Sequence, residues 1–189
     1  MAGRSAYHHG DLAAATVDEA LRLIAAEPAA KLSMRALAER LGVAHRALYN
    51  HFATREALLA AVAARGFERL ASQLAAAPDA GRFLAAYVRF ALAEPGLYDV
   101  MTQRQHTQIN AHPALRAAVD RVIAIALAVL ASPAADEETR RRQVMRVWML
   151  AHGGIGLQRA GMLRLRSDSE FADEILHIAG LAQTREPRA

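Results

Sequence analysis

The stretch from Leu32 to Leu59 restricts the fold of this chain more than any other. Ser33 is a good helix N-cap, and Leu32 before it can pack on Leu37 inside the helix that follows. Gly42 stands where a helix commonly ends in a left-handed residue, which glycine adopts without a Cβ clash. The apolar pattern restarts directly after this glycine. The stretch therefore predicts two short helices joined by a tight turn, followed by a longer helix.

The second of these short helices is rich in hydrogen-bond donors. Five side chains that can donate lie close together on it, namely His45, Arg46, Tyr49, Asn50 and His51. This density is unusual for an ordinary surface helix and suits a groove lined with phosphates and base edges. The spacing of the whole stretch is that of a helix-turn-helix. The alternative is that these are merely three helices of an all-α core.

Composition supports an all-α chain. Of the 189 residues 53% are hydrophobic, largely through alanine, and few segments alternate with the period of a strand. The net charge of +4 is compatible with an anionic partner without proving one. Because the chain has no cysteine, disulfides, thiolate catalysis and cysteine-based zinc sites are excluded.

Signatures of other protein classes are missing from the sequence. There is no glycine-rich phosphate loop and no nucleophile elbow, so we expect no enzyme and no cofactor. Eight histidines are present, but none forms a His-x3-His pair with a carboxylate partner, so we expect no metal site. An all-α enzyme would rest only on Tyr, His and Glu residues in the second half. No apolar run reaches about 18 residues and no secretory segment is recognisable, which predicts a cytoplasmic protein.

The helix-turn-helix stretch resembles the DNA-binding signature of the TetR family of bacterial transcriptional regulators. The similarity lies in SMRALAERLGV and in ALYNHFATREALL, where Tyr49, His51, Phe52, Thr54 and Arg55 match the family closely. A mere helical core would not require such a combination. The resemblance implies a three-helix DNA-binding domain over residues 1–55. It also implies a helical bundle over residues 56–189 that binds an effector and dimerises.

The resemblance assigns DNA contacts to both short helices and to the start of the next one. Arg46 would read a base edge, while Tyr49, His51 and Arg55 would contact phosphates, with Ser33 and Arg35 completing the phosphate clamp. Asn50 stands where many members carry a larger residue, which leaves its role open. The residues expected to bind DNA are Ser33, Arg35, Ala44, His45, Arg46, Ala47, Tyr49, Asn50, His51, Thr54 and Arg55. The N-terminal arm with Arg4, His8 and His9 either approaches the DNA or frays.

The segment VWMLAHGGIGLQRAG resembles the C-terminal domain of one subgroup of these regulators, marked by a Trp followed by His-Gly. EPGLYDVM resembles the same subgroup. The aromatic and apolar side chains expected to contact an effector are Tyr87, Phe90, Tyr98, Met101, Trp148 and His152. The alternative for each of them is ordinary core packing.

Three glycines, Gly153, Gly154 and Gly156, lie inside the same predicted helix. Glycine costs up to about 1 kcal/mol against alanine in a helix, and close approach of another helix is the simplest reason for a cluster. We therefore expect a dimer surface between Trp148 and Leu181, where two helices from each subunit form a four-helix bundle. It includes Gly153, Gly156, Phe171, Ile175 and Ile178. A break beside a ligand cavity is the alternative.

Together these features predict a homodimeric repressor on a palindromic operator, with half-sites about 34–36 Å apart. A small apolar effector would release it, with the long helix after Thr54 carrying the motion. The alternative is a DNA-binding activator or architectural protein without a small-molecule response.

Overall fold

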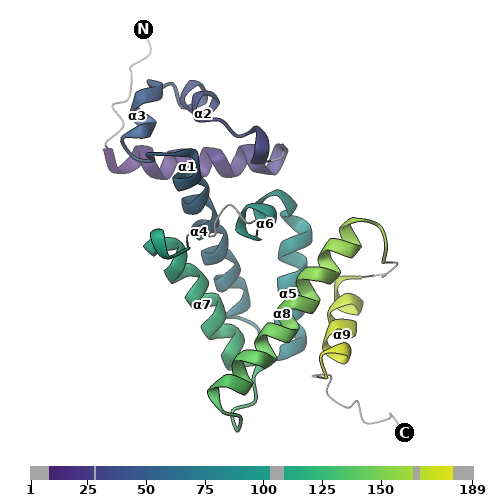
Figure 1. Ribbon diagram of the computed structural model, residues 1–189. Coiled ribbons are helices and arrows are strands. Elements are labelled where there is room, and N and C mark those ends of the chain that lie inside the picture. Colours follow the sequence, from purple (N-terminus) through teal and green to yellow (C-terminus); the bar gives the residue numbers. More distant parts are fainter. Residues whose placement is uncertain (1–8, 28, 103–108, 164–166, 181–189) are drawn as a thin grey trace, which may run out of the picture. The chain divides into compact units, whose positions relative to one another are not determined.

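The computed structural model describes residues 9–27, 29–102, 109–163 and 167–180 (Figure 1). Within these ranges the chain is helical and contains no strand, which confirms the expected all-α fold. In chain order the helices are α1 (His9–Ala26), α2 (Met34–Leu41), α3 (His45–Tyr49), α4 (Arg55–Leu74), α5 (Ala80–Ala93), α6 (Pro95–Thr102), α7 (Pro113–Leu130), α8 (Glu137–Arg159) and α9 (Asp168–Ile178), with 3-10 turns η1 (Ala29–Lys31) and η3 (Ile109–Ala111). None of the described helices is long and apolar enough to cross a membrane.

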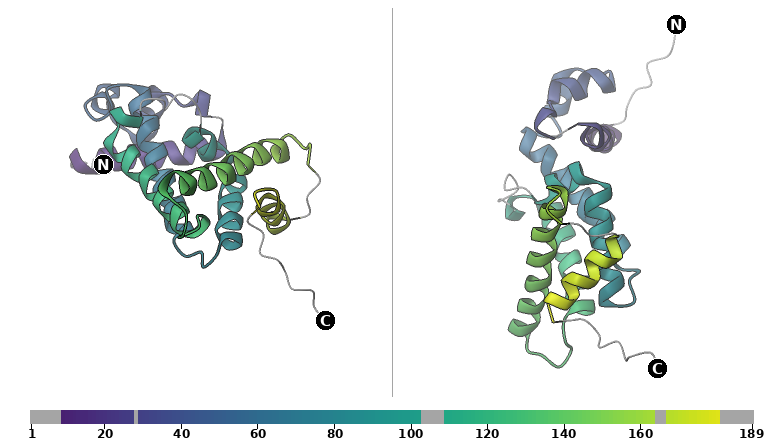
Figure 2. Two further views of the ribbon diagram at one scale, coloured as in Figure 1. Left: turned by 60° about the horizontal axis from the view of Figure 1, so that its bottom comes forward. Right: turned by 90° about the vertical axis from the view of Figure 1, so that its right-hand side faces the viewer.

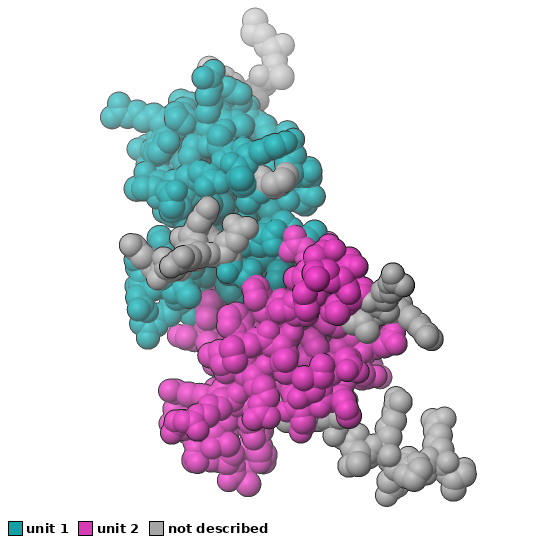
Figure 3. Space-filling view, turned by 45° about the vertical axis from the view of Figure 1, so that its right-hand side comes forward, with its two compact units in different colours: residues 1–67, 94–117 teal, residues 68–93, 118–189 magenta. Residues whose placement is uncertain are grey.

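The chain forms two compact units, which are coloured separately in Figure 3. The first comprises residues 1–67 and 94–117, and the second comprises residues 68–93 and 118–189. Helix α4 contributes its beginning to the first unit and its end to the second. This grouping differs from a division at residue 55, because α6 and the start of α4 belong to the same unit as the helix-turn-helix.

The first unit contains the predicted three-helix head. Helix α1 packs against α2 and α3, and Ala20, Leu37 and Leu48 are fully buried. Glu19 of α1 is also buried and receives hydrogen bonds from Arg22 on its own helix and from Arg40 on α2. This ion-pair cluster ties α1 to α2 beside the apolar core.

Helix α6 lies against α1 and against the start of α4 within the first unit. Two glycines allow the close approach. A Cβ on Gly96 would collide with the backbone carbonyl of Ile24 in α1. A Cβ on Gly66 in α4 would lie 2.6 Å from the sulfur of Met101. A side chain at residue 96 would therefore push α6 away from α1, whereas one at residue 66 would displace the side chain of Met101.

The second unit is organised around α5, which packs on α8 and α9 while these two also pack on each other. Figure 2 shows α9 lying beside them. Gly154 makes the contact between α8 and α9 possible, because a Cβ there would lie 2.6 Å from Cζ of Phe171. Arg146 of α8 donates a hydrogen bond of 3.1 Å to the carbonyl of Ala179, the C-cap of α9.

Candidate nucleic-acid interface

Local capping fixes the geometry of the helix-turn-helix. The hydroxyl of Ser33 accepts a hydrogen bond of 3.1 Å from the N–H of Ala36, as expected of an N-cap. Gly42 ends α2 with a φ of 67°, and the N–H of Val43 donates to the carbonyl of Ala38 at 3.0 Å. Both sequence-based expectations, the cap and the left-handed glycine, are confirmed. The turn therefore has a single, well-defined geometry.

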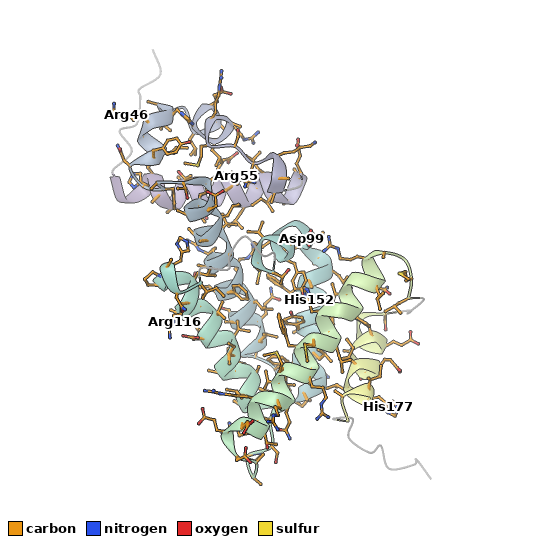
Figure 4. The ribbon with its side chains drawn as sticks, in the orientation of Figure 1. Arg46, Arg55, Asp99, Arg116, His152 and His177 are labelled. Atoms are coloured by element: carbon orange, nitrogen blue, oxygen red, sulfur yellow. The ribbon has the colours of Figure 1, made fainter. Side chains whose placement is uncertain are left out.

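Helix α3 has one buried and one exposed side. Leu48 is fully buried and Phe52 just after the helix is nearly so. The side chains that leave the opposite side are His45, Arg46, Tyr49 and Asn50, all of them exposed. Figure 4 shows Arg46 at the outer end of the head. Ala47 and His51 are partly exposed at the margins of this face.

Neighbouring side chains on this surface are held in place by local contacts. The rings of His45 and Tyr49, one helical turn apart, meet edge to face with centroids 5.0 Å apart. On α2 the Nε of Arg35 lies 3.0 Å from Glu39 Oε1, and both side chains are exposed. The exposed donors can thus face a nucleic-acid groove with little rearrangement.

Two more of the residues expected to bind DNA, Ala44 and Thr54, lie at the N-terminal ends of α3 and α4. Ala44 is the N-cap of α3 and makes no side-chain capping bond. The hydroxyl of Thr54 accepts a hydrogen bond of 3.1 Å from the N–H of Ala57 and so caps α4. The arm residues Arg4 and His8 lie outside the described residues, as does the side chain of His9.

Arg55 has partners that sequence reasoning missed. Its Nε donates a hydrogen bond of 2.9 Å to the carbonyl of Leu32, and its Nη2 donates one of 2.6 Å to the carbonyl of Ala29. The guanidinium is partly buried between α4 and the segment that precedes α2. Figure 4 shows Arg55 within the head, whereas Arg46 lies at its outer end.

The expected effector contacts separate into two groups. In the second unit the indole N–H of Trp148 donates a hydrogen bond of 3.1 Å to the hydroxyl of Tyr87, and the indole stacks on His152 with ring centroids 5.7 Å apart. Phe90 is buried on α5. Tyr98 and Met101 are buried on α6 in the first unit. Trp148 is 45% exposed and therefore lies at the surface of the described chain, not in its core.

The residues expected at a dimer surface are also divided. Gly153, Gly156 and Ile178 are exposed, and a Cβ on either glycine would meet no atom within 4 Å. Phe171 and Ile175 are buried inside the chain, both on the side of Gly154. Within the single chain these two side chains contribute to the contact between α8 and α9, and their expected place at a dimer surface stays a prediction.

The residues named from the sequence as dimer contacts do not include three apolar side chains on the exposed side of α8. Met145, Met149 and Leu157 are 50%, 58% and 43% exposed. With Gly153 and Gly156 they form what we call the α8 face. Met145, Met149 and Leu157 are four and eight residues apart, and this spacing is the signal that could have placed them on one side of a helix.

Comparisons with known proteins identify the family of this arrangement. Residues 17–62 match the family described as bacterial regulatory proteins, tetR family, and residues 80–178 match the tetracyclin repressor-like C-terminal domain. The uncharacterized HTH-type transcriptional regulator Rv0681 of Mycobacterium tuberculosis is 29% identical over 177 residues, which are 89% of this chain and 80% of that protein.

Solved structures are similar over nearly the whole chain. A Rhodococcus sp. RHA1 protein of unknown function has 28% identity and a TM-score of 0.69, with 95% of this chain and 100% of that one covered. A TetR transcriptional regulator from the same organism has 20% identity and a TM-score of 0.67, with 90% and 94% covered, and supports the fold alone. With both halves matched by family models, the chain belongs to the TetR family of bacterial transcriptional regulators.

Proposed function

We propose that this regulator is a homodimeric repressor that binds a palindromic DNA operator and leaves it when a small molecule binds. The observation that carries the DNA-binding part is the exposed side of α3, where four donor side chains lie opposite the buried Leu48. Arg46 would form a paired contact with a guanine, and Tyr49 and His51 would contact phosphates, as would Ser33 and Arg35 from α2.

The α8 face supports the dimer. Apolar side chains of a single chain rarely gather on one exposed helix side without a partner. Here Met145, Met149 and Leu157 flank two glycines whose Cα atoms are open to close approach. In a two-fold dimer this face would pack on its own copy, and Ile178 of α9 would lie at its edge. Two recognition helices would then reach successive major grooves.

The effector would bind in the second unit beside Tyr87, Trp148 and His152, and contacts from Phe90, Tyr98 and Met101 remain a prediction. The rings of Tyr87, Trp148 and His152 are joined by a hydrogen bond and by stacking, which supports an apolar or aromatic ligand with a polar group. Because binding free energies are linked, the ligand must weaken DNA binding by the same factor by which DNA weakens ligand binding.

The decisive experiment is selection of DNA sites from a random pool, followed by a ligand screen for loss of the selected site. We expect a palindrome whose half-sites are about one helical turn apart. A site that no compound releases, together with increased transcription in a reporter strain, would favour the alternative of an activator or architectural protein. Failure to select any sequence would overturn the proposal.

A further inference from the structure

We propose that Arg55 is a positioning residue for DNA binding: its guanidinium holds the N-terminus of α2 in place and does not itself bind a phosphate. The proposal rests on the DNA-binding function proposed above. It differs from the role that the family resemblance suggests for this arginine, and it comes from the two carbonyl groups to which Arg55 is bonded.

The segment before α2 has few means of holding its own shape. Residues 29–31 form one 3-10 turn, closed by a hydrogen bond of 3.1 Å from the N–H of Leu32 to the carbonyl of Ala29. A single such turn is weak. The carbonyl of Ala29 accepts the hydrogen bond that closes the turn, while the carbonyl of Leu32 follows the turn and lies outside it. Arg55 supplies two donors, one for the carbonyl of Ala29 and one for that of Leu32.

Both carbonyls lie in the segment that directly precedes α2, the helix from which Ser33 and Arg35 are proposed to contact DNA. Leu32 is buried and directly precedes Ser33, the N-cap of α2. Fixing its carbonyl therefore fixes where the first N–H groups of α2 point. Helix N-termini are favourable places for a phosphate, provided that the N–H groups face it. The bond from Arg55 thus sets the direction of a contact that α2 makes.

The geometry requires arginine and not merely a positive charge. A guanidinium presents several N–H groups in one rigid plane, so that Nε and Nη2 can donate to two separate carbonyl oxygens. Lysine carries its donors on a single flexible nitrogen and cannot reproduce this fork. A phosphate contact would depend mostly on charge, which lysine keeps. The two roles therefore predict opposite behaviour of Arg55→Lys.

The test measures the affinity of the full-length protein for its selected operator against salt concentration. We expect Arg55→Ala and Arg55→Lys to weaken operator binding by a similar factor, about tenfold or more. The slope of log affinity against log salt concentration should stay that of the wild type. Arg35→Ala is the matched control, because loss of a true phosphate contact lowers the slope by about 0.9 per contact. Near-normal binding by Arg55→Lys, combined with a reduced slope for Arg55→Ala, would overturn the proposal.

A measurement on the wild type keeps the proposal testable if both variants fail to fold. In protein labelled with 15N-arginine, the Nε–H of Arg55 should exchange slowly with water before DNA is added and should shift little afterwards. An Nε–H that becomes protected only on DNA addition would contradict the positioning role. If the wild type selects no operator at all, the DNA-binding proposal fails, whatever the state of this resonance.

Discussion

The indole N–H of Trp148 donates a hydrogen bond to the hydroxyl of Tyr87, 61 positions earlier in the chain, and so joins α8 to α5. The indole also stacks on His152, and Trp148 is 45% exposed. Trp148 is the only tryptophan of the chain. Its fluorescence therefore reports on this contact without interference from any other indole.

Tyr87→Phe should loosen the contact without emptying the space around it. The phenyl ring keeps the packing, while the indole loses its acceptor, and we expect a loss of about 0.5–1.5 kcal/mol in the free energy of unfolding. The emission of Trp148 should change even in the folded protein. Denaturant unfolding monitored by circular dichroism, together with emission spectra, measures both effects.

The same variant tests the effector site. A compound that releases DNA from the wild type should alter Trp148 emission and should bind Tyr87→Phe more weakly. Phe83→Leu, which changes a different buried side chain of α5, controls for general loosening of the helix. Equal ligand affinity of the wild type and Tyr87→Phe would place the ligand elsewhere.

Met149→Glu should convert the proposed dimer into monomers. Met149 is 58% exposed in the single chain and lies on the α8 face. In a two-fold interface the new carboxylate would be buried near its own copy, and an unpaired buried charge costs roughly 3 kcal/mol, a factor of about 100 in affinity. Sedimentation or light scattering at several concentrations measures the change.

Ile123→Glu is the matched control for that substitution. Ile123 is also an exposed apolar residue, 44% accessible, but it belongs to α7. A charge there should leave the assembly unchanged. If both variants dissociate, or neither does, the α8 face is not the dimer surface.

The sequence was sufficient for the features that depend on local chemistry. The cap at Ser33 and the left-handed Gly42 follow from what each residue type permits, and the structure confirms them. The caps and the turn of the helix-turn-helix are formed by residues that lie close together in the sequence. Its fold could therefore be predicted from a single chain.

What could not be predicted depends on contacts between distant segments. Gly153, Gly154 and Gly156 are chemically equivalent in the sequence, and only the approach of Phe171 selects Gly154 as the close contact. The partners of Arg55 lie 23 and 26 positions away and are backbone atoms, which carry no residue-specific signal. The exposure of Trp148 likewise depends on how α5 and α8 are packed.

Gly154→Ala and Gly153→Ala should have opposite effects on stability. A methyl group at residue 154 would lie 2.6 Å from Cζ of Phe171, and overpacking of this kind costs about 1–3 kcal/mol. At residue 153 nothing lies within 4 Å, so the better helix propensity of alanine should stabilise by up to about 1 kcal/mol. Both are best measured by denaturant unfolding in the Met149→Glu background, where dimerisation does not contribute. Equal effects would mean that α9 does not pack on α8 as described.

Lowering the pH should destabilise the three-helix head, because Glu19 becomes protonated. Hydrogen bonds from Arg40 and then from Arg22 lower the pKa of this buried carboxyl below its usual value. The stabilisation is therefore present above the ordinary glutamate pKa of about 4.3 and is lost as the pH falls through the lowered pKa. The unfolding free energy of the wild type should exceed that of Glu19→Gln at pH 7, and the difference should shrink towards pH 3. A difference that is independent of pH would argue against the ion-pair cluster.

Arg46→Ala should change which sequences are bound, whereas Arg35→Ala should weaken binding to all sequences alike. The exposed Arg46 stands at the start of the recognition helix, where a paired contact with guanine contributes about 1–3 kcal/mol of discrimination per base pair. Arg35 lies on α2, and we expect its side chain to contact a phosphate. Repeating the site selection with each variant measures the difference. For Arg46→Ala one position in each half-site should lose its preference, while for Arg35→Ala the selected site should stay the same and only the affinity should fall. An unchanged preference at every position for Arg46→Ala would mean that another side chain of α3, such as His45, reads the operator.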